Sequence, residues 1–180
     1  MNMGIKTSSK ELVSSLNFAL RGIAHPRRVG TFLQTPEDVA EKIAQEVSGK
    51  NVVEFGPGLG AITYKILERL PTDGRLYCFE LDPYFYKELA KKIKDPRFTI
   101  FLKSAEYLEQ EVANFDCIVS GLPLTALERS VAEMILEVSK KAKRFIQYKY
   151  FPSAKMLENY FKNIREEKAG IYIIYVCDNK

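Results

Sequence analysis

The residues best suited to chemistry lie in a glycine-rich segment, E54-F-G-P-G-L-G60, which follows a short apolar run. Glycines at this spacing (Gly56, Gly58 and Gly60) would let the backbone approach a ligand closely, and the helix expected next would offer free N–H groups to an anionic group. The segment also fits the dinucleotide-binding pattern G-x-G-x-x-G/A. It therefore predicts a loop that binds a cofactor.

Two acidic residues narrow the choice of cofactor. Glu54 stands two residues before the first glycine, where a carboxylate would repel a pyrophosphate but attract the ammonium and sulfonium groups of S-adenosylmethionine. Glu80 ends the next apolar run, twenty residues after Gly60. At that position an acid accepts hydrogen bonds from ribose hydroxyls in dinucleotide-binding folds. The pair favours S-adenosylmethionine over a dinucleotide.

A second candidate site is the corner S120-G-L-P-L124, which follows the apolar run 115–119. In doubly wound sheets, ligands bind beyond the carboxyl ends of the strands. We therefore expect this corner to face the transferred group and to align the amine that receives it. The residues expected to do so are Ser120, Gly121, Leu122 and Pro123.

Strand-like and helix-like segments alternate along the chain. The expected strands are 51–55, 75–81, 97–103, 115–119, 143–149 and 170–177, and the expected helices are 36–47, 62–70, 82–94, 106–113, 128–140 and 153–163. Residues 163–176 are strand-like on both sides of Gly170, which allows a terminal strand pair with one antiparallel member. The alternation predicts an α/β fold: a Rossmann-like, doubly wound, mostly parallel seven-stranded sheet with helices on both faces.

The first 35 residues differ from the rest. Apolar residues recur there at helical spacing: Leu12, Leu16, Leu20 and Ile23. They predict an amphipathic helix that ends before Pro26, followed by a basic linker, with Thr35 as the cap of the next helix. We therefore divide the chain into 1–35, the amphipathic helix and basic linker, and 36–180, the catalytic domain.

Charge is distributed unevenly between these parts. Residues 1–35 carry five Lys and Arg against one acid, residues 36–139 carry 12 against 18, and residues 140–180 carry 10 against four. The basic ends favour an anionic partner. Three cysteines without paired spacing argue against a disulfide framework or a zinc site, so no metal is expected. The N-terminus has no secretion-signal pattern, which favours a cytoplasmic location.

The glycine loop and F79-E-L-D82 resemble the first two motifs of class I S-adenosylmethionine-dependent methyltransferases, and the likeness covers about residues 36–177. The resemblance implies that the loop binds the methionine part and Glu80 the ribose. After the third strand the family commonly has an Asp against the adenine, where this chain has K103-S-A-E106; Ser104 or Glu106 takes that contact. The cofactor residues so implied are Glu54, Gly56, Gly58, Gly60, Glu80, Leu81, Ser104, Ala105, Glu106 and Ser120.

The corner bears on the substrate. Amine-methylating relatives end a similar corner with an aromatic residue that stacks on a base, but Leu124 stands there and cannot supply stacking worth roughly 1–3 kcal/mol. The segment 25–36 together with the corner resembles bacterial phospholipid N-methyltransferases. That resemblance implies methylation of phosphatidylethanolamine towards phosphatidylcholine at the inner face of the membrane. Arg27 and Arg28 would hold the lipid phosphate, and an anionic membrane surface would be the partner.

A lipid amine must lose a proton before it attacks the methyl group. Tyr148, Tyr150 and His25 are the candidates to accept it, and Tyr148 is expected rather to orient the amine. Two other functions stay open. One is methylation of adenine in ribosomal RNA, with nucleic acid as the less expected partner, because such dimethylases continue into a helical domain while this chain ends at Lys180. The other is a non-catalytic module that binds S-adenosylmethionine. The oligomeric state is open.

Overall fold

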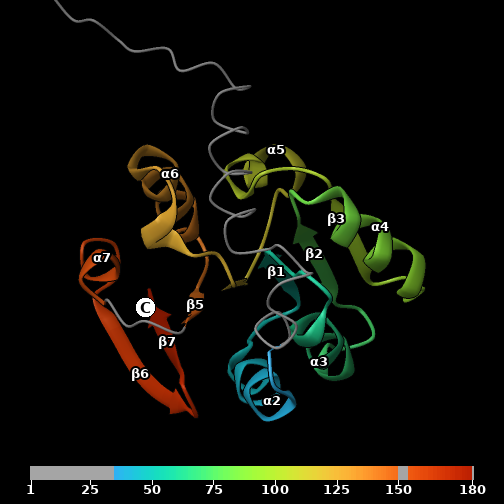
Figure 1. The fold of residues 1–180 in the computed structure, drawn as a ribbon, viewed down its shortest axis with the longest axis horizontal. Coiled ribbons are helices and arrows are strands. Elements are labelled where there is room, and N and C mark those ends of the chain that lie inside the picture. The colour runs from blue at the N-terminus through green and yellow to red at the C-terminus, as the bar shows by residue number, and fades with distance from the viewer. Residues whose placement is uncertain (1–34, 150–153, 180) are drawn as a thin grey trace, which may run out of the picture.

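The computed structural model describes residues 35–149 and 154–179 (Figure 1). The strands are β1 (Asn51–Phe55), β2 (Arg75–Phe79), β3 (Phe98–Phe101), β4 (Cys117–Ser120), β5 (Arg144–Lys149), β6 (Asn163–Ala169) and β7 (Tyr172–Asp178). The α-helices are α2 (Glu37–Glu46), α3 (Ala61–Arg69), α4 (Pro83–Lys92), α5 (Leu108–Glu111), α6 (Arg129–Ser139) and α7 (Lys155–Glu158). Two 3₁₀ turns, η1 (Ala105–Tyr107) and η2 (Leu124–Ala126), complete the elements.

All seven strands form one sheet in the order β3-β2-β1-β4-β5-β7-β6. The first five strands are parallel to one another, whereas β7 runs antiparallel to both β5 and β6. Figure 1 shows α4 at one side of the molecule beside β3, and α7 and β6 at the opposite side. The predicted Rossmann-like, mostly parallel seven-stranded fold is confirmed.

Each face of the sheet is covered by its own helices. Val52 points to the face where α2, α3 and α4 bury residues such as Ile43, Ile66 and Leu89. Val53, the next residue, points to the other face, where α5, α6 and α7 bury residues that include Ile135. This alternation follows from the two-residue period of a strand. It explains why the central strands are apolar throughout: both of their faces are buried.

Two expected elements differ in the structure. The helix predicted over 153–163 is wrong: α7 is a single short turn, and the chain enters β6 at Asn163. Leu157 and Phe161, whose spacing suggested a longer helix, are both buried, and their side chains anchor this short turn in the core instead. The terminal strand pair forms, with Gly170 in its turn at φ +60°.

The start of α2 also differs. Pro36 occupies the cap position and no side chain caps the helix, so the expectation for Thr35 is wrong. The amphipathic helix expected before it lies outside the described residues. Within 35–149 and 154–179, no helix is long and apolar enough to cross a membrane.

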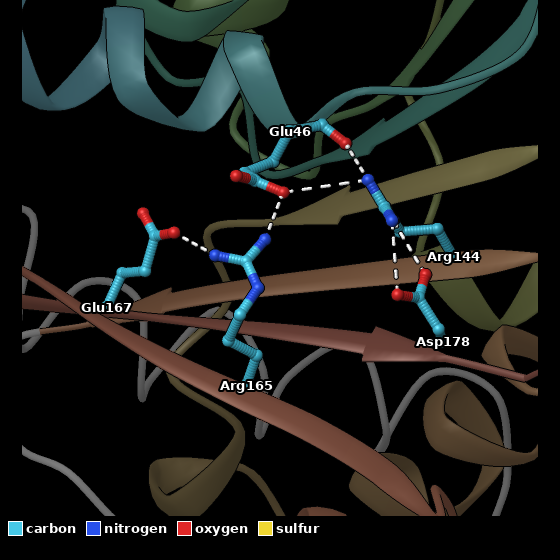
Figure 2. A network of polar contacts seen from close by, with 5 residues as sticks. All are labelled: Glu46, Arg144, Arg165, Glu167 and Asp178. Carbon is cyan, nitrogen blue, oxygen red and sulfur yellow. Dashed lines mark hydrogen bonds and ion pairs between the residues drawn. The ribbon is translucent and has the colours of Figure 1, made fainter.

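An ion-pair network joins α2 to the last three strands (Figure 2). Arg144 donates to Asp178 through Nε at 2.7 Å and Nη2 at 3.1 Å, and to the backbone carbonyl of Glu46 at 2.9 Å. Arg165 pairs with the carboxylates of Glu46 and Glu167. The network lies where β5 begins, at the opposite end of the sheet from the carboxyl ends of the parallel strands.

We expect Arg144→Met to lower the free energy of unfolding by about 1–3 kcal/mol, because it removes three hydrogen bonds and leaves the partly buried carboxylate of Asp178 without its cation. Urea unfolding measures the change. The matched control is Arg129→Met, since Arg129 pairs with Glu133 while 89% exposed, and such a pair is worth at most about 1 kcal/mol. Equal losses in both variants would contradict a stabilising role for the network.

Candidate active site

The order of the sheet reverses between β1 and β4, and this is where a crevice is expected in such folds. After β1 the chain turns to α3 on one face, and after β4 it turns to α6 on the other. The N–H of Gly121 donates to the carbonyl of Phe55 at 2.9 Å, and the N–H of Gly56 donates to that of Phe79 at 2.9 Å. The glycine loop, the end of β2 and the corner after β4 are thus held side by side.

The three glycines of the loop all have left-handed backbone angles, with φ of +69° at Gly56, +57° at Gly58 and +88° at Gly60. A Cβ on Gly60 would lie 2.6 Å from Leu89 Cδ2, and one on Gly56 would lie 3.0 Å from Leu122 Cδ2. Among the residues that the structure describes, a Cβ on Gly58 would meet nothing within 4 Å. Gly56 and Gly60 therefore allow close packing, whereas Gly58 faces the open side of the loop, where a ligand would approach.

Glu80 ties the loop to the end of β2. Its Oε2 accepts the N–H of Gly58 at 3.1 Å, and its Oε1 accepts the N–H groups of Leu81 and Asp82 at 2.8 Å each. Burial raises the pKa of Glu80, and the three N–H groups act in the opposite direction. The carboxylate is therefore fixed at the edge of the sheet, as the expected contact with ribose hydroxyls requires.

Glu54 lies behind the loop rather than in front of it. It stands opposite Cys78 in register on the face covered by α3, is 2% exposed, and accepts a hydrogen bond from Thr63 Oγ1 at 2.7 Å. Burial raises its pKa to about 7, and the charge of Glu80 adds to the rise. Thr63 was missed in the sequence, although a threonine on the apolar side of the first turn of a helix is a usable signal.

The residues after β3 hold unsatisfied polar atoms. Ser104 is buried, and neither its Oγ nor Oε2 of Glu106 has a hydrogen-bond partner among the described residues. Burial raises the pKa of Glu106. Buried polar atoms are usually paired, so both atoms fit a ligand that brings donors. With Ala105 buried between them and Gly58 open, these residues fit S-adenosylmethionine.

The corner after β4 is held from below by β5. Ser120 is fully buried, and its Oγ accepts the N–H of Leu122 at 3.4 Å. Gln147, which pairs with Ser120 in register, donates from Nε2 to the carbonyl of Leu122 at 3.0 Å. Tyr148 lies against Gly121, because a Cβ there would be 2.5 Å from its hydroxyl. Gln147 was missed as a site residue, although a polar residue inside an apolar strand marks it.

Leu124 does not line the site. It is 2% exposed and packs among the buried residues beneath α6. The packing of the core therefore determines which side chain fits at position 124, and the absence of an aromatic residue there says little about the substrate. Pro123, just before it, is half-buried at the start of η2.

Some of the expected site residues lie beyond what the structure describes. Arg27, Arg28, His25 and Tyr150 lie outside the described residues. Among the basic residues near the C-terminus, Arg144 and Arg165 are engaged in the network of Figure 2. Over 35–149 and 154–179, no group of three or more His, Cys, Asp or Glu is placed to hold a metal ion.

The raised pKa of Glu54 predicts a pH-dependent stability. The folded value of about 7 lies above the ordinary 4.5, so the folded state binds more protons between these values. The stabilisation is fully present below pH 4.5 and is lost as pH rises through 7. We expect the free energy of unfolding to fall by about 3 kcal/mol over this range relative to Glu54→Gln, measured by urea unfolding.

The Glu54→Gln variant is the control for the wild-type protein, because its amide has the same shape as the carboxyl group but does not titrate. Parallel curves for the two proteins between pH 4.5 and 7 would contradict a titrating, buried Glu54.

The open side of Gly58 predicts a selective effect on cofactor binding. Gly58→Val should weaken binding of S-adenosylmethionine about tenfold or more, because the side chain would fill the path of the ligand. Isothermal titration calorimetry measures the affinity. Gly170→Val is the matched control: Gly170 has φ +60°, its Cβ would also meet nothing within 4 Å, and it lies in the β6–β7 turn. Equal losses of affinity would contradict the assignment of the loop.

Comparison with known proteins gives one family. The sequence model of the family "Ribosomal RNA adenine dimethylase" matches residues 30–144. A protein of Aromatoleum aromaticum, ribosomal RNA small subunit methyltransferase A, is 35% identical over 95 residues, which are 52% of this chain and 32% of that protein. The protein of the same name from Variovorax paradoxus is 29% identical over 116 residues, 63% of this chain and 40% of its own length. The chain thus spans less than half the length of these relatives.

Solved structures agree on the fold. A magnesium protoporphyrin IX methyltransferase from Synechocystis, with bound S-adenosylmethionine, superposes with a TM-score of 0.62 at 14% identity, covering 97% of this chain and 98% of the other. A didemethyltoxoflavin N1-methyltransferase from Burkholderia thailandensis gives a TM-score of 0.65 at 15% identity, covering 99% and 92%. At these identities the similarity concerns the fold alone.

These matches overturn part of the expected function. The resemblance to phospholipid N-methyltransferases, with a lipid substrate and a membrane partner, is wrong, because the family model and the curated relatives all concern ribosomal RNA. The expected membership of the S-adenosylmethionine-dependent methyltransferases is confirmed at the level of the family. The chain belongs to the ribosomal RNA adenine dimethylase family.

Proposed function

We propose that this protein transfers methyl groups from S-adenosylmethionine to the exocyclic amine of an adenine in RNA. The observation that carries the proposal is the corner after β4, which the Gly121–Phe55 hydrogen bond holds directly beside the glycine loop. A target amine at this corner would lie next to the methyl donor. Membership of an RNA adenine dimethylase family supports adenine as the base.

Methylation of an adenine amine requires fewer catalytic groups than methylation of a lipid amine. The exocyclic amine is neutral at pH 7, so no side chain has to remove a proton before it attacks. Transfer would form the N–C bond as the S–C bond breaks, S-adenosylhomocysteine would leave, and the surplus proton of the methylated amine would pass to water. S-adenosylmethionine supplies the electrophilic methyl group when it is bound. The remaining task of the protein is to hold the amine in line with that group, and positioning alone can account for several kcal/mol of a barrier.

The corner is built for positioning. Backbone carbonyls in the Ser120–Pro123 segment are the acceptors for the two N–H groups of the amine, which would turn its lone pair towards the methyl group. Gln147 fixes the segment by its hydrogen bond to the Leu122 carbonyl, and the ring of Tyr148 supports Gly121 from below. The acceptors are therefore held rigidly before the substrate arrives, which limits the cost of ordering them.

The proposal is tested with labelled S-adenosylmethionine and three samples: total RNA, anionic liposomes that contain phosphatidylethanolamine, and buffer. We expect label in RNA, recovered as N6-methylated adenosine after digestion to nucleosides. Label in lipid, or in a nucleoside other than adenosine, would refute the proposal. Gly58→Val should abolish the transfer, whereas Gly170→Val should retain it.

The role of the corner is tested in the same assay with Gly121→Ala. The added Cβ would lie 2.5 Å from the Tyr148 hydroxyl and 3.2 Å from the Gly56 carbonyl, so the corner must shift. Methyl transfer should fall about tenfold or more, and by more than cofactor affinity does. The control is Gly74→Ala in a distant turn, whose Cβ would lie 2.6 Å from Leu70 Cγ. A comparable loss of transfer in the control would point to stability instead.

A further inference from the structure

Helix α4 carries a basic surface within an acidic part of the chain. Residues 36–139 carry 12 Lys and Arg against 18 acids, but residues 83–94 carry four lysines against one glutamate. All four lysines are exposed; they are Lys87, Lys91, Lys92 and Lys94. Three of the lysines lie on α4 and Lys94 follows just after its end, so they are gathered in one short segment rather than spread along the domain.

The lysines lie opposite the buried side of the helix. Phe85, Leu89 and Ile93 are buried against the sheet. Tyr84, Lys87 and Lys91 follow at positions i, i+3 and i+7, which share one face of a helix. Because the buried residues lie on the other side, this row points away from the protein.

Most of these lysines are not neutralised. Within residues 35–149 and 154–179, no carboxylate forms an ion pair with Lys87, Lys91 or Lys94, whereas Lys92 pairs with Glu88 at 3.0 Å. By contrast, Lys140, Lys141 and Lys143 near β5 all have acidic partners. The α4 row thus has positive charge available for a ligand.

Two tyrosines accompany the lysines. Tyr84 is 58% exposed at the start of α4, and Tyr64 of α3 is 39% exposed. Tyr84 lies on the same helix as the lysines, and Tyr64 lies beside this helix, since its ring and Leu89 of α4 both adjoin Gly60. Exposed aromatic rings between lysines are what single-stranded nucleic acids bind, since bases stack on the rings and phosphates meet the cations.

The surface adjoins the cofactor loop. Helix α4 begins at Pro83, directly after the segment in which Glu80 holds the loop. A Cβ on Gly60 would lie 2.6 Å from Leu89 of α4 and 3.3 Å from the ring of Tyr64. Figure 1 shows the helix at the outer side of the molecule beside β3. A strand of RNA with its target base in the site could therefore continue over α4.

We propose that Tyr64, Tyr84, Lys87, Lys91 and Lys94 form an RNA-docking surface that holds a single-stranded segment flanking the target adenine. The inference rests on the proposed function and names where the substrate binds. The lysines neutralise phosphates, and the tyrosines stack on bases. A membrane fits this surface less well, because the apolar side of α4 is buried in the core and only polar residues and two tyrosines face outward.

The charge contribution is tested by a triple variant, Lys87→Gln, Lys91→Gln and Lys94→Gln, with a fluorescein-labelled single-stranded RNA 20-mer rich in adenine as the probe. At 0.1 M salt the Kd should rise about tenfold or more. The slope of log K against log salt should become shallower by about 2, since each phosphate contact to a single strand contributes about 0.7. Affinity for S-adenosylmethionine should stay unchanged.

The matched control removes the same charge elsewhere. Lys155 on α7, Lys168 on β6 and Lys162 between these elements are all exposed, and α7 and β6 lie at the opposite side of the molecule from α4. Replacement of all three by Gln should change the Kd less than about threefold. Equal effects of the two triple variants, or no binding of the RNA by the wild-type protein, would overturn the inference.

Stacking is tested separately. Tyr84→Ala should weaken binding about fivefold or more, whereas Tyr84→Phe, which keeps the ring, should bind as the wild type does. If Phe weakens binding as much as Ala, the ring does not stack and the inference loses its aromatic contacts.

The outcome is distinguishable from that of the proposed function. RNA binding that depends on α4, without methyl transfer by the wild-type protein, would support the surface and refute the activity. The opposite result is that the triple variant of Lys87, Lys91 and Lys94 methylates RNA with the Kd and KM of the wild type. That result would support the activity and overturn the surface. Binding of vesicles of phosphatidylglycerol that depends on α4, with RNA binding unaffected, would also overturn it.

Discussion

The site depends on one constraint, the reversal of strand order between β1 and β4. Because α3 covers one face of the sheet and α6 the other, the chain leaves these two neighbouring strands in opposite directions, and their ends are not covered by a crossing connection. The space between them is narrow: the carbonyl of Gly56 would lie 3.2 Å from a Cβ on Gly121. A side chain at Gly121 would also meet the Tyr148 hydroxyl, and one at Gly56 would meet the side chain of Leu122, so both glycines serve the packing of the loop against the corner.

The electrostatics of the crevice follow from the same geometry. Glu54 on β1 and Glu80 just after β2 are both buried, so burial disfavours ionisation of both, and the charge of Glu80 further disfavours ionisation of Glu54. Glu80 is compensated by three backbone N–H groups, whereas Glu54 has Thr63 and Cys78 as hydrogen-bond donors. A cationic ligand would relieve this repulsion and an anionic one would add to it. The protein thus selects a positively charged cofactor through charges that mostly lie behind the contact surface.

Much of the fold could be predicted from the sequence, because the parallel strands are buried on both faces and therefore appear as clear apolar runs. β1 was predicted with its observed bounds, and the glycine loop, Glu80 and the corner were predicted to meet. The errors occurred where pairing between strands, rather than local sequence, determines the secondary structure. Leu157 and Phe161 suit a helix locally, but antiparallel pairing with β7 draws the following residues into β6. Thr63 and Gln147 stand out in the sequence as polar residues at apolar positions, but their partners, Glu54 and the carbonyl of Leu122, are identified only once the helix and the strands are in place.

The error about the substrate has a similar origin. Leu124 was taken as a missing stacking residue because it ends the corner, where relatives have an aromatic residue, but in the structure it lies in η2 and its side chain packs in the core beneath α6. The absence of an aromatic there is therefore a fact about packing. A short motif fixes the path of the backbone, and the direction of each side chain depends on the elements that follow. Under the proposed function, stacking on a base would accordingly come from residues outside the corner, and the exposed tyrosines Tyr64 and Tyr84 on neighbouring helices could supply it without disturbing the core.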